Sequence, residues 1–246
     1  MTENKFDPKM VKERIIKWIR EWFEVNGNGC NAVIGISGGK DSSICAALCV
    51  EALGKDRVVG VLMPNITQDD IIDSYRVVEF LGIQSYTIPI TLPVASIHSQ
   101  LEYSGMNVTN QTAINLPARI RMSVLYAVSQ SLNGRVINTC NLSENWIGYS
   151  TRYGDDAGDM SPLGDLTVKE IKMLGRELGL PIDLVDKTPS DGLCGKTDED
   201  NFGFSYDALD NYILNGECSD EEIRAKIDDL HKKNLFKTRP MPTFIM

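Results

Sequence analysis

The sequence predicts an α/β fold, a doubly wound, mostly parallel five-stranded sheet flanked by helices. Short runs of β-branched and apolar residues alternate with longer runs of helical periodicity, and such strands pair in parallel through right-handed crossovers. The first run ends in a turn with two adjacent glycines that continues into a helix. The 246 residues suffice for one large domain with a buried core, whereas two full domains would be cramped.

The chain is predicted to open with an amphipathic helix. Asp7 is a helix-capping residue, and Pro8 suits the first helical turn. Large apolar side chains then recur at helical spacing, at Val11, Ile15, Trp18 and Trp22. This aromatic stripe is interpreted as core packing rather than as a cofactor site.

The later elements continue the alternation. Strands are predicted at 31–36, 58–63, 85–90 and 135–140. Helices are predicted from the glycine turn to about 53, near 69–81, at about 116–132 and at 167–178, and the last of these is followed by Gly179 and Pro181. A helical pair near 206–214 and 220–230 comes last, and the stretches 141–165 and 186–204 are predicted to be irregular loops.

The glycine turn is the first candidate site. Two glycines let the backbone approach an anion closely, and the amides of the following helix point at it. Three hydroxyls, one lysine and one acid accompany them in the sequence Ser37-Gly38-Gly39-Lys40-Asp41-Ser42-Ser43. An acid beside phosphates implies a cation, so the segment predicts a magnesium-nucleotide site, although a glycine-rich turn without a ligand is the simpler alternative.

Two commoner phosphate loops do not match this turn. A Walker loop needs glycine and Ser or Thr where the chain has Ile34 and Asp41. The spacing of Gly35, Ser37 and Gly38 also fails the dinucleotide-binding fingerprint. Residues 37–42 and 139–144 both follow predicted strands, and ligands collect at the carboxyl ends of such strands, so one cleft could contain both segments.

Composition excludes several function classes. The net charge is −9, with 25 basic and 34 acidic residues, which disfavours a nucleic-acid partner. Six cysteines without any C-x-x-C pair and only two histidines disfavour a zinc site, a disulfide framework and a histidine-based triad. The sequence has neither a signal-peptide pattern nor a transmembrane stretch, so a cytoplasmic location without a membrane partner is expected.

The glycine turn resembles the SGGxDS loop of the N-type ATP pyrophosphatases, which cleave ATP to AMP and pyrophosphate. Further segments, taken in order along nearly the whole chain, resemble the ammonia-dependent NAD synthetases of that superfamily. They are Ala118-Arg119-Ile120-Arg121-Met122, Thr139-Cys140-Asn141-Leu142-Ser143-Glu144, Arg152-Tyr153-Gly154-Asp155-Asp156-Ala157-Gly158-Asp159, Lys187-Thr188-Pro189-Ser190 and Tyr206-Asp207-Ala208-Leu209-Asp210.

The resemblance implies a fold of the adenine nucleotide alpha hydrolase type and an activity. In this family ATP activates the nicotinate carboxylate of deamido-NAD as an adenylate, pyrophosphate leaves, and free ammonia then displaces AMP to give NAD, the last step of NAD biosynthesis. It further implies Mg²⁺ as cofactor, a homodimer, and a single synthetase domain over residues 1–246 without a glutaminase domain. Two alternatives stay open, namely another N-type ATP pyrophosphatase such as a tRNA-modifying ligase, and a non-catalytic ATP-binding module.

The resemblance also implies roles for individual residues. Lys40, Asp41 and Lys187 are the expected catalytic residues, and Asp41 and Glu144 are the expected magnesium ligands. ATP is expected to contact Gly35, Ile36, Ser37, Gly38, Gly39, Lys40, Asp41, Ser42, Thr139, Lys169 and Ser190. Deamido-NAD is expected to contact Arg119, Arg152, Asp159, Phe236 and Lys237, with Arg119 supplied by the opposite subunit.

The chain departs from the family pattern at several of these positions. Val168 stands where the family has a lysine, and Lys169 follows one place later. Arg152 replaces a lysine, which keeps the charge but changes the hydrogen-bonding geometry. Phe236 and Lys237 stand where the family has a His-Lys pair. Without the motifs, Arg119 would be interpreted as part of a solvated helix face, and Glu144 and Asp159 as loop acids.

Overall fold

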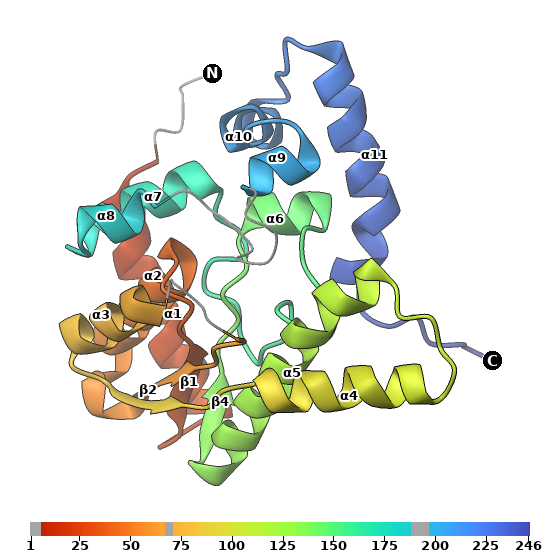
Figure 1. The fold of residues 1–246 in the computed structure, drawn as a ribbon. Coiled ribbons are helices and arrows are strands. Elements are labelled where there is room, and N and C mark those ends of the chain that lie inside the picture. The colour runs from red at the N-terminus through yellow and green to blue at the C-terminus, as the bar shows by residue number, and fades with distance from the viewer. Residues whose placement is uncertain (1–5, 67–70, 188–196) are drawn as a thin grey trace.

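The centre of the molecule is a parallel four-stranded sheet. The computed structural model describes residues 6–66, 71–187 and 197–246. Its strands are β1 (Asn31–Gly35), β2 (Val58–Leu62), β3 (Gln84–Thr87) and β4 (Gly134–Val136), in the spatial order β3-β2-β1-β4 (Figure 1). All three strand pairs are parallel. The chain thus builds outward from β1 to β3 and then returns to the other side of β1, which makes the β1–β4 boundary a topological switch point where ligands bind in such sheets.

Helices cover both faces of this sheet. Along β1, Ala32 and Ile34 pack into one apolar cluster, whereas Val33 packs into another, as the alternation of a strand requires. The first cluster includes side chains of α1 (Pro8–Asn26), α2 (Lys40–Leu53), α3 (Ile71–Leu81) and α7 (Val168–Glu177). The second includes side chains of α4 (Thr91–Tyr103) and α5 (Asn110–Ser131). The predicted doubly wound α/β class is therefore confirmed.

A further layer of helices is built from the C-terminal half of the chain. These helices are α6 (Leu142–Ile147), α9 (Asp198–Phe202), α10 (Tyr206–Asn215) and α11 (Glu221–Thr238), and they lie together above the sheet in Figure 1. They share an apolar cluster formed by Ile147, Val168, Phe202, Phe204, Tyr206, Leu209 and Ile227. Short segments α8 (Ile182–Val185) and η1 (Lys55–Arg57) complete the described elements. None of the described helices is both long enough and apolar enough to cross a membrane.

The first helix was predicted correctly, and its buried face was predicted in part, since Ile15 and Trp22 pack against the core. The Asp7 carboxylate accepts hydrogen bonds from the Lys9 and Met10 amides, so the predicted cap is confirmed. The fully buried side chains are Ile16, Ile19 and Phe23, whereas Trp18 is 42% exposed. The core-facing stripe is thus rotated from the predicted one, because Ile16, Ile19 and Phe23 share the helix face that meets α2 and α7.

The prediction of five strands was wrong, because the fifth position is held by a single bridge. Residues 158–160 run beside β4, where the Asp159 amide donates to the Val136 carbonyl at 2.7 Å and the Asn138 amide donates to Met160. The Val136 amide, however, donates to Asp159 Oδ2 at 2.7 Å. A side chain therefore takes the place of a backbone partner, and the ladder does not extend.

The observed helices and strands differ from the predicted ones at several other places. Strand β4 ends at Val136, four residues before the predicted end. Helix α5 begins at Asn110, where Thr109 caps it, and continues through the buried Pro117. Helix α4 was not predicted, and α6 and α9 form inside stretches predicted to be irregular. Both α6 and α9 begin with a capping box, whose two reciprocal hydrogen bonds stabilise a short helix start.

The edge contact of Asp159 can be tested by mutation. We expect Asp159→Ala to lower the free energy of unfolding by about 1–3 kcal/mol, because the Val136 amide would lose its partner. Asp159→Asn retains an oxygen for that amide and should stay within about 1 kcal/mol of the original chain. Urea unfolding measures both, with the exposed Asp165→Ala as control. An Asp159→Ala protein as stable as the control would show that this carboxylate is not needed by the fold.

Candidate functional site

The glycine turn connects β1 to α2 and presents the start of a helix. Gly38 has φ +79°, a conformation that favours glycine. The turn is braced internally, since the Ser37 amide donates to Ser42 Oγ and the Ser43 hydroxyl donates to the Gly39 carbonyl at 2.7 Å. No side chain caps the N-terminus of α2. Its first amides therefore remain available to an anion, as the sequence predicted.

Lys40 and Asp41, at the start of α2, form a buried ion pair. Lys40 Nζ donates to Asp41 Oδ2 at 2.8 Å, and the Lys40 side chain is 3% exposed. Burial alone would lower the pKa of Lys40, but the carboxylates of Asp41, Glu144 and Asp198 outweigh it and the pKa is raised. Lys40 is therefore a charged group, and its ammonium lies 5.9 Å from the ring centroid of Tyr206. This ion pair fixes the direction of the Asp41 carboxylate.

Asn141 links Asp41 to Glu144. This fully buried residue follows β4, and its Nδ2 donates to Asp41 Oδ1 at 3.4 Å. Its Oδ1 accepts the Glu144 amide at 2.9 Å, while its own amide donates to Glu144 Oε2. Burial raises the pKa of Glu144 to about 8, with a further rise from Asp41 and an opposing effect of Lys40. The two predicted metal ligands, 103 positions apart in the sequence, are thus brought to one place.

The chemistry of this pair fits a magnesium ion that comes with phosphates. Among the described residues no group of three or more His, Cys, Asp or Glu side chains could hold a metal by itself. Mg²⁺ is usually bound by one or two carboxylates together with phosphate oxygens and water. The Asp41 and Glu144 carboxylates, beside the glycine turn, supply that donor set. A cation there would also offset the repulsion that raises the pKa of Glu144.

A cavity of about 400 Å³ lies beside α7. Lys169, a predicted ATP contact, lines it together with Lys172, Arg176 and Tyr206. The Tyr206 ring also faces Lys40, so it borders both the cavity and the Lys40–Asp41 ion pair. Val168, which replaces the lysine of the family pattern, lines the cavity too but is buried in the apolar cluster of α6 and α10. The charge that the family carries at that position is therefore absent from this cluster.

Four of the predicted substrate contacts form a second group. On α5, Arg119 Nε donates to the Arg152 carbonyl at 3.3 Å. The Arg152 guanidinium lies 5.0 Å from the Tyr153 ring centroid and 5.5 Å from that of Phe236. Lys237 donates to the carbonyls of Gly148 and Ser150. Residues from α5, the loop after α6 and the end of α11 are thus collected into one basic, aromatic patch.

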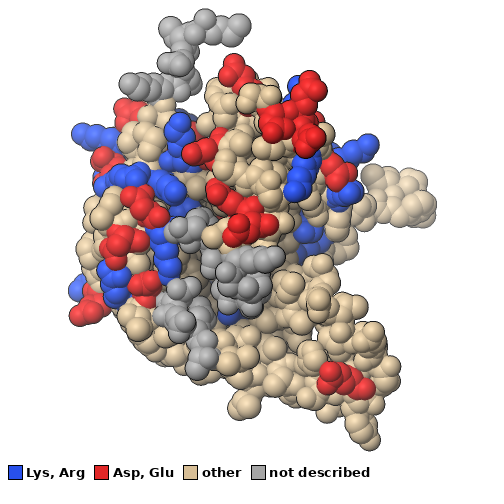
Figure 2. Space-filling view, turned by 45° about the horizontal axis from the view of Figure 1, so that its top comes forward, with Lys and Arg blue, Asp and Glu red and all other residues tan. Residues whose placement is uncertain are grey.

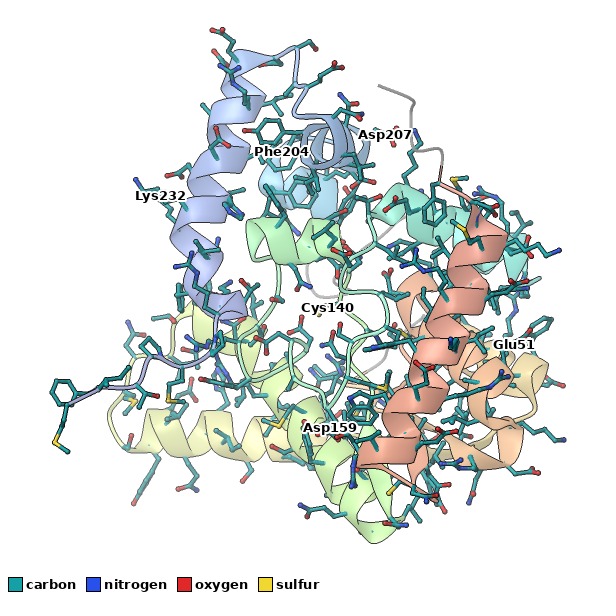
Figure 3. The ribbon with its side chains drawn as sticks, turned by 180° about the vertical axis from the view of Figure 1, so that it is seen from behind. Glu51, Cys140, Asp159, Phe204, Asp207 and Lys232 are labelled. Atoms are coloured by element: carbon teal, nitrogen blue, oxygen red, sulfur yellow. The ribbon has the colours of Figure 1, made fainter. Side chains whose placement is uncertain are left out.

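The remaining predicted residues lie apart from that patch. Asp159 accepts from Tyr126 and Val136 through its two oxygens, and Figure 3 shows it farther from α6 than Cys140 is. Lys187 donates to Asp73 Oδ2 of α3 at 2.7 Å and is the main cause of the lowered pKa of Asp73. Thr139 lies half-buried between β4 and α6. Ser190 falls outside the described residues, so its predicted role is not described structurally.

Sequence reasoning assigned no role to three buried polar residues of this region. Asn141 joins the two carboxylates, and the Tyr206 hydroxyl donates to Asp198 at 3.1 Å beside Lys40. Asp210 accepts from the Ser143 hydroxyl and from the Lys169 amide, which ties α6 to α7. Asn141 could have been found, because Asn followed three residues later by Glu is a capping-box pattern. Tyr206 and Asp210 belong to a segment that resembles the family, but no capping or turn pattern indicates their hydrogen bonds.

Asn141 both caps α6 and donates to Asp41, and two substitutions distinguish these contacts. Asn141→Ala should lower the free energy of unfolding by about 1–2 kcal/mol, because the α6 cap is lost. Asn141→Ser restores a capping oxygen but lacks the amide that reaches Asp41, so it should recover most of this stability. Guanidinium unfolding of both variants measures the difference. Equal losses in the two variants would contradict the capping role.

The chain resembles known proteins over almost its whole length. The model of the NAD synthase family matches residues 11–242. The NH(3)-dependent NAD(+) synthetase of Methanocaldococcus jannaschii is 38% identical over 95% of both chains.

Two solved structures extend this likeness to the fold. The NMN synthetase from Francisella tularensis superposes with a TM-score of 0.91 at 30% identity, covering 98% of this chain and 100% of that one. The NH3-dependent NAD synthetase from Campylobacter jejuni superposes with a TM-score of 0.79 at 31% identity, covering 98% and 99%. Since the family model spans residues 11–242 and these relatives align with most of the chain, the chain belongs to the NAD synthase family.

Proposed function

We propose that this protein is a ligase that uses ATP and free ammonia to amidate the nicotinate carboxylate of deamido-NAD, giving NAD, AMP and pyrophosphate. The observation that carries the proposal is the joining of Asp41 and Glu144 by Asn141 beside the uncapped start of α2. That arrangement supplies amides for a phosphate chain and carboxylates for its cation. The 38% identity to an NH(3)-dependent NAD(+) synthetase supports the choice of acceptor and of ammonia.

The first half-reaction is the formation of an adenylate. An oxygen of the nicotinate carboxylate attacks the α-phosphorus of ATP, and the bond to the bridging oxygen breaks, so pyrophosphate leaves. Amides of Ser37 to Ser42 would hold the departing phosphates, with Asp41 and Glu144 as ligands of Mg²⁺. When bound, Mg²⁺ supplies charge neutralisation of the leaving group. Lys40 orients Asp41 through its buried ion pair.

The second half-reaction transfers the acyl group to nitrogen. Ammonia attacks the acyl carbon, the bond from that carbon to the AMP oxygen breaks, and one proton is lost from nitrogen. Arg119, Arg152, Phe236 and Lys237 would contact the dinucleotide, since guanidinium groups suit its pyrophosphate. Thr139, Lys169, Ser190 and Lys187 are further proposed contacts with ATP, and Asp159 with deamido-NAD. Lys187 is paired with Asp73 of α3, so a contact of Lys187 with phosphates would require that ion pair to break.

The protein is proposed to act as a cytoplasmic homodimer. Large apolar side chains are exposed on α4 and just after it, with Leu92 81% exposed, Tyr103 91% and Met106 61%. Figure 2 shows few charged residues over this end of the molecule. Exposed large apolar side chains of this kind suit an interface, and α5 would bring Arg119 close to it. Five described cysteines are free thiols, as expected in a reducing compartment.

A second acceptor is favoured by one observation. The superposition on the NMN synthetase reaches a TM-score of 0.91, against 0.79 for the Campylobacter NAD synthetase at nearly equal identity. Nicotinate mononucleotide carries the same carboxylate as deamido-NAD but lacks the adenylyl half. Purified protein with Mg²⁺, ATP and ammonium, given each acceptor in turn, distinguishes the two by the ratio of kcat/KM values. Absence of AMP with both acceptors would overturn the proposed function.

The role of Asp41 is tested by Asp41→Asn, which preserves shape and removes the charge. We expect NAD formation to fall by about 100-fold or more, because a metal ligand is lost. Folding should be retained, since Asn keeps the shape of the side chain and an oxygen that can still accept from Lys40 Nζ. The exposed Asp56→Asn of η1 serves as control. A rate equal to that of the control at saturating Mg²⁺ would refute the role.

The dimer is tested by mixing two inactive variants. Arg119→Ala should weaken binding of deamido-NAD, and Asp41→Asn should abolish turnover. If Arg119 reaches the opposite subunit's site, co-refolded heterodimers of the two variants contain one intact site, and about half of the activity per heterodimer should return. No recovery in a mixture shown to contain heterodimers would place Arg119 in its own subunit's site.

A further inference from the structure

Helix α6 carries Glu144 but is too short to hold its own position. It has six residues, and helices of this length are not stable alone in water. Its N-terminal end is held by Asn141, which also reaches Asp41, and by the Ser143 hydroxyl, which donates to Asp210. Any change in the tilt or register of α6 therefore moves the Glu144 carboxylate relative to Asp41. The other end of α6 must be fixed by something outside the helix.

Helix α11 contacts that other end through a row of polar side chains. His231 Nδ1 lies 2.7 Å from the Trp146 carbonyl, and Asn234 Nδ2 donates to the Ile147 carbonyl at 3.0 Å. Lys237 donates to the carbonyls of Gly148 and Ser150. The three donors stand three residues apart along α11, a spacing that places neighbours on one helix face. They satisfy carbonyls at the end of α6, where a helix leaves such groups unpaired.

The approach of the two helices is unusually close. Gly148 has φ +65°, and a Cβ atom built on it would overlap Asn234 Cβ. The imidazole of His231 stacks on the Trp146 indole, with ring centroids 4.4 Å apart and planes 25° apart. Because a carbonyl oxygen only accepts, Nδ1 of His231 must carry the proton of the hydrogen bond to Trp146.

We infer that His231 and Asn234 are positioning residues that fix the end of α6 and thereby place Glu144 beside Asp41. Apolar packing of Ile147 against Ile227 and Leu209 keeps α6 buried, but such packing is non-directional. Hydrogen bonds to successive carbonyls, by contrast, define both the rotation and the axial position of the helix. The purpose of this placement rests on the proposed function, in which Asp41 and Glu144 share a cation.

Matched variants separate the hydrogen bond from the stacking. His231→Phe keeps an aromatic ring over Trp146 but has no donor. His231→Asn loses the ring but places an amide donor close to the position of Nδ1. Asn234→Ala removes the second donor. Lys233→Ala, on the same helix with a side chain 69% exposed, is the control.

Two measurements on the full chain are needed. The first is amide hydrogen exchange of residues 142–149 in metal-free protein, which reports the position of α6 without any assay. The second is the Mg²⁺ concentration that gives half-maximal NAD formation, measured together with KM for deamido-NAD. A residue that acts only on overall stability would lower Tm without changing the half-saturating Mg²⁺ concentration.

We expect His231→Phe and Asn234→Ala to speed exchange of the α6 amides about fivefold, with exchange in α2 unchanged. The half-saturating Mg²⁺ concentration should rise about tenfold, as for other groups that orient metal ligands, while KM for deamido-NAD stays constant. His231→Asn should restore both values toward those of the original chain. Exchange and Mg²⁺ dependence equal to those of Lys233→Ala would overturn the inference. If the original chain forms no NAD, the proposed function fails, and the exchange measurement alone decides the positioning role.

Discussion

The structure depends on how one buried positive charge is balanced by two negative ones. Lys40 pairs directly with Asp41, and Glu144 lies near enough for its carboxylate to help raise the pKa of Lys40, while burial and Asp41 raise its own pKa. Burial and Asp41 raise the pKa of Glu144 because one ammonium cannot neutralise both carboxylates, so ionisation of Glu144 leaves a surplus of negative charge in a largely desolvated place. That surplus favours a cation. Of the two helices that follow β1 and β4, α6 has a side-chain cap and α2 has none, so the available amides belong to the phosphate turn. A cation and the phosphates would therefore bind side by side at this turn.

The topology explains why these charges meet at all. Strands β1 and β4 are neighbours in the sheet but lie a hundred residues apart in the chain, and both lead into helices at the same edge. Asn141 joins the two segments directly, because it caps α6 and donates a hydrogen bond to Asp41. Asp159 and residues 158–160 close the outer side of β4, so the loop that carries Asn141 is supported from both sides. Fold and site are therefore stabilised by the same few polar residues.

Much of this arrangement could be predicted where the signal was local. The turn from Ser37 to Asp41 depends on adjacent glycines after an apolar strand, and the structure places it as expected. A family resemblance, not residue spacing, predicted the role of Glu144 and the grouping of Arg119, Arg152 and Phe236. The prediction of a fifth strand failed because the Asp159 side chain accepts a hydrogen bond from the Val136 amide, a contact that periodicity does not indicate. Trp18 proved exposed because the helix partners, not the residue's own hydrophobicity, select the buried face. The capping role of Asn141 could have been predicted from the pattern Asn-x-x-Glu, whereas its contact with Asp41 requires α2, β4 and α6 to be assembled.

The central claim, that Asp41 and Glu144 form one cation site beside the phosphate turn, is tested most directly by thermal unfolding of Glu144→Gln. Tm is measured with and without Mg²⁺ at a fixed saturating concentration of ATP. The account predicts that Mg²⁺ raises the Tm of the original chain by mass action but leaves that of Glu144→Gln nearly unchanged. It also predicts that without Mg²⁺, at a pH above the Glu144 pKa of about 8, the variant is the more stable of the two, since its neutral amide does not repel Asp41 as the ionised Glu144 does. An equal rise in Tm for both proteins would contradict the claim.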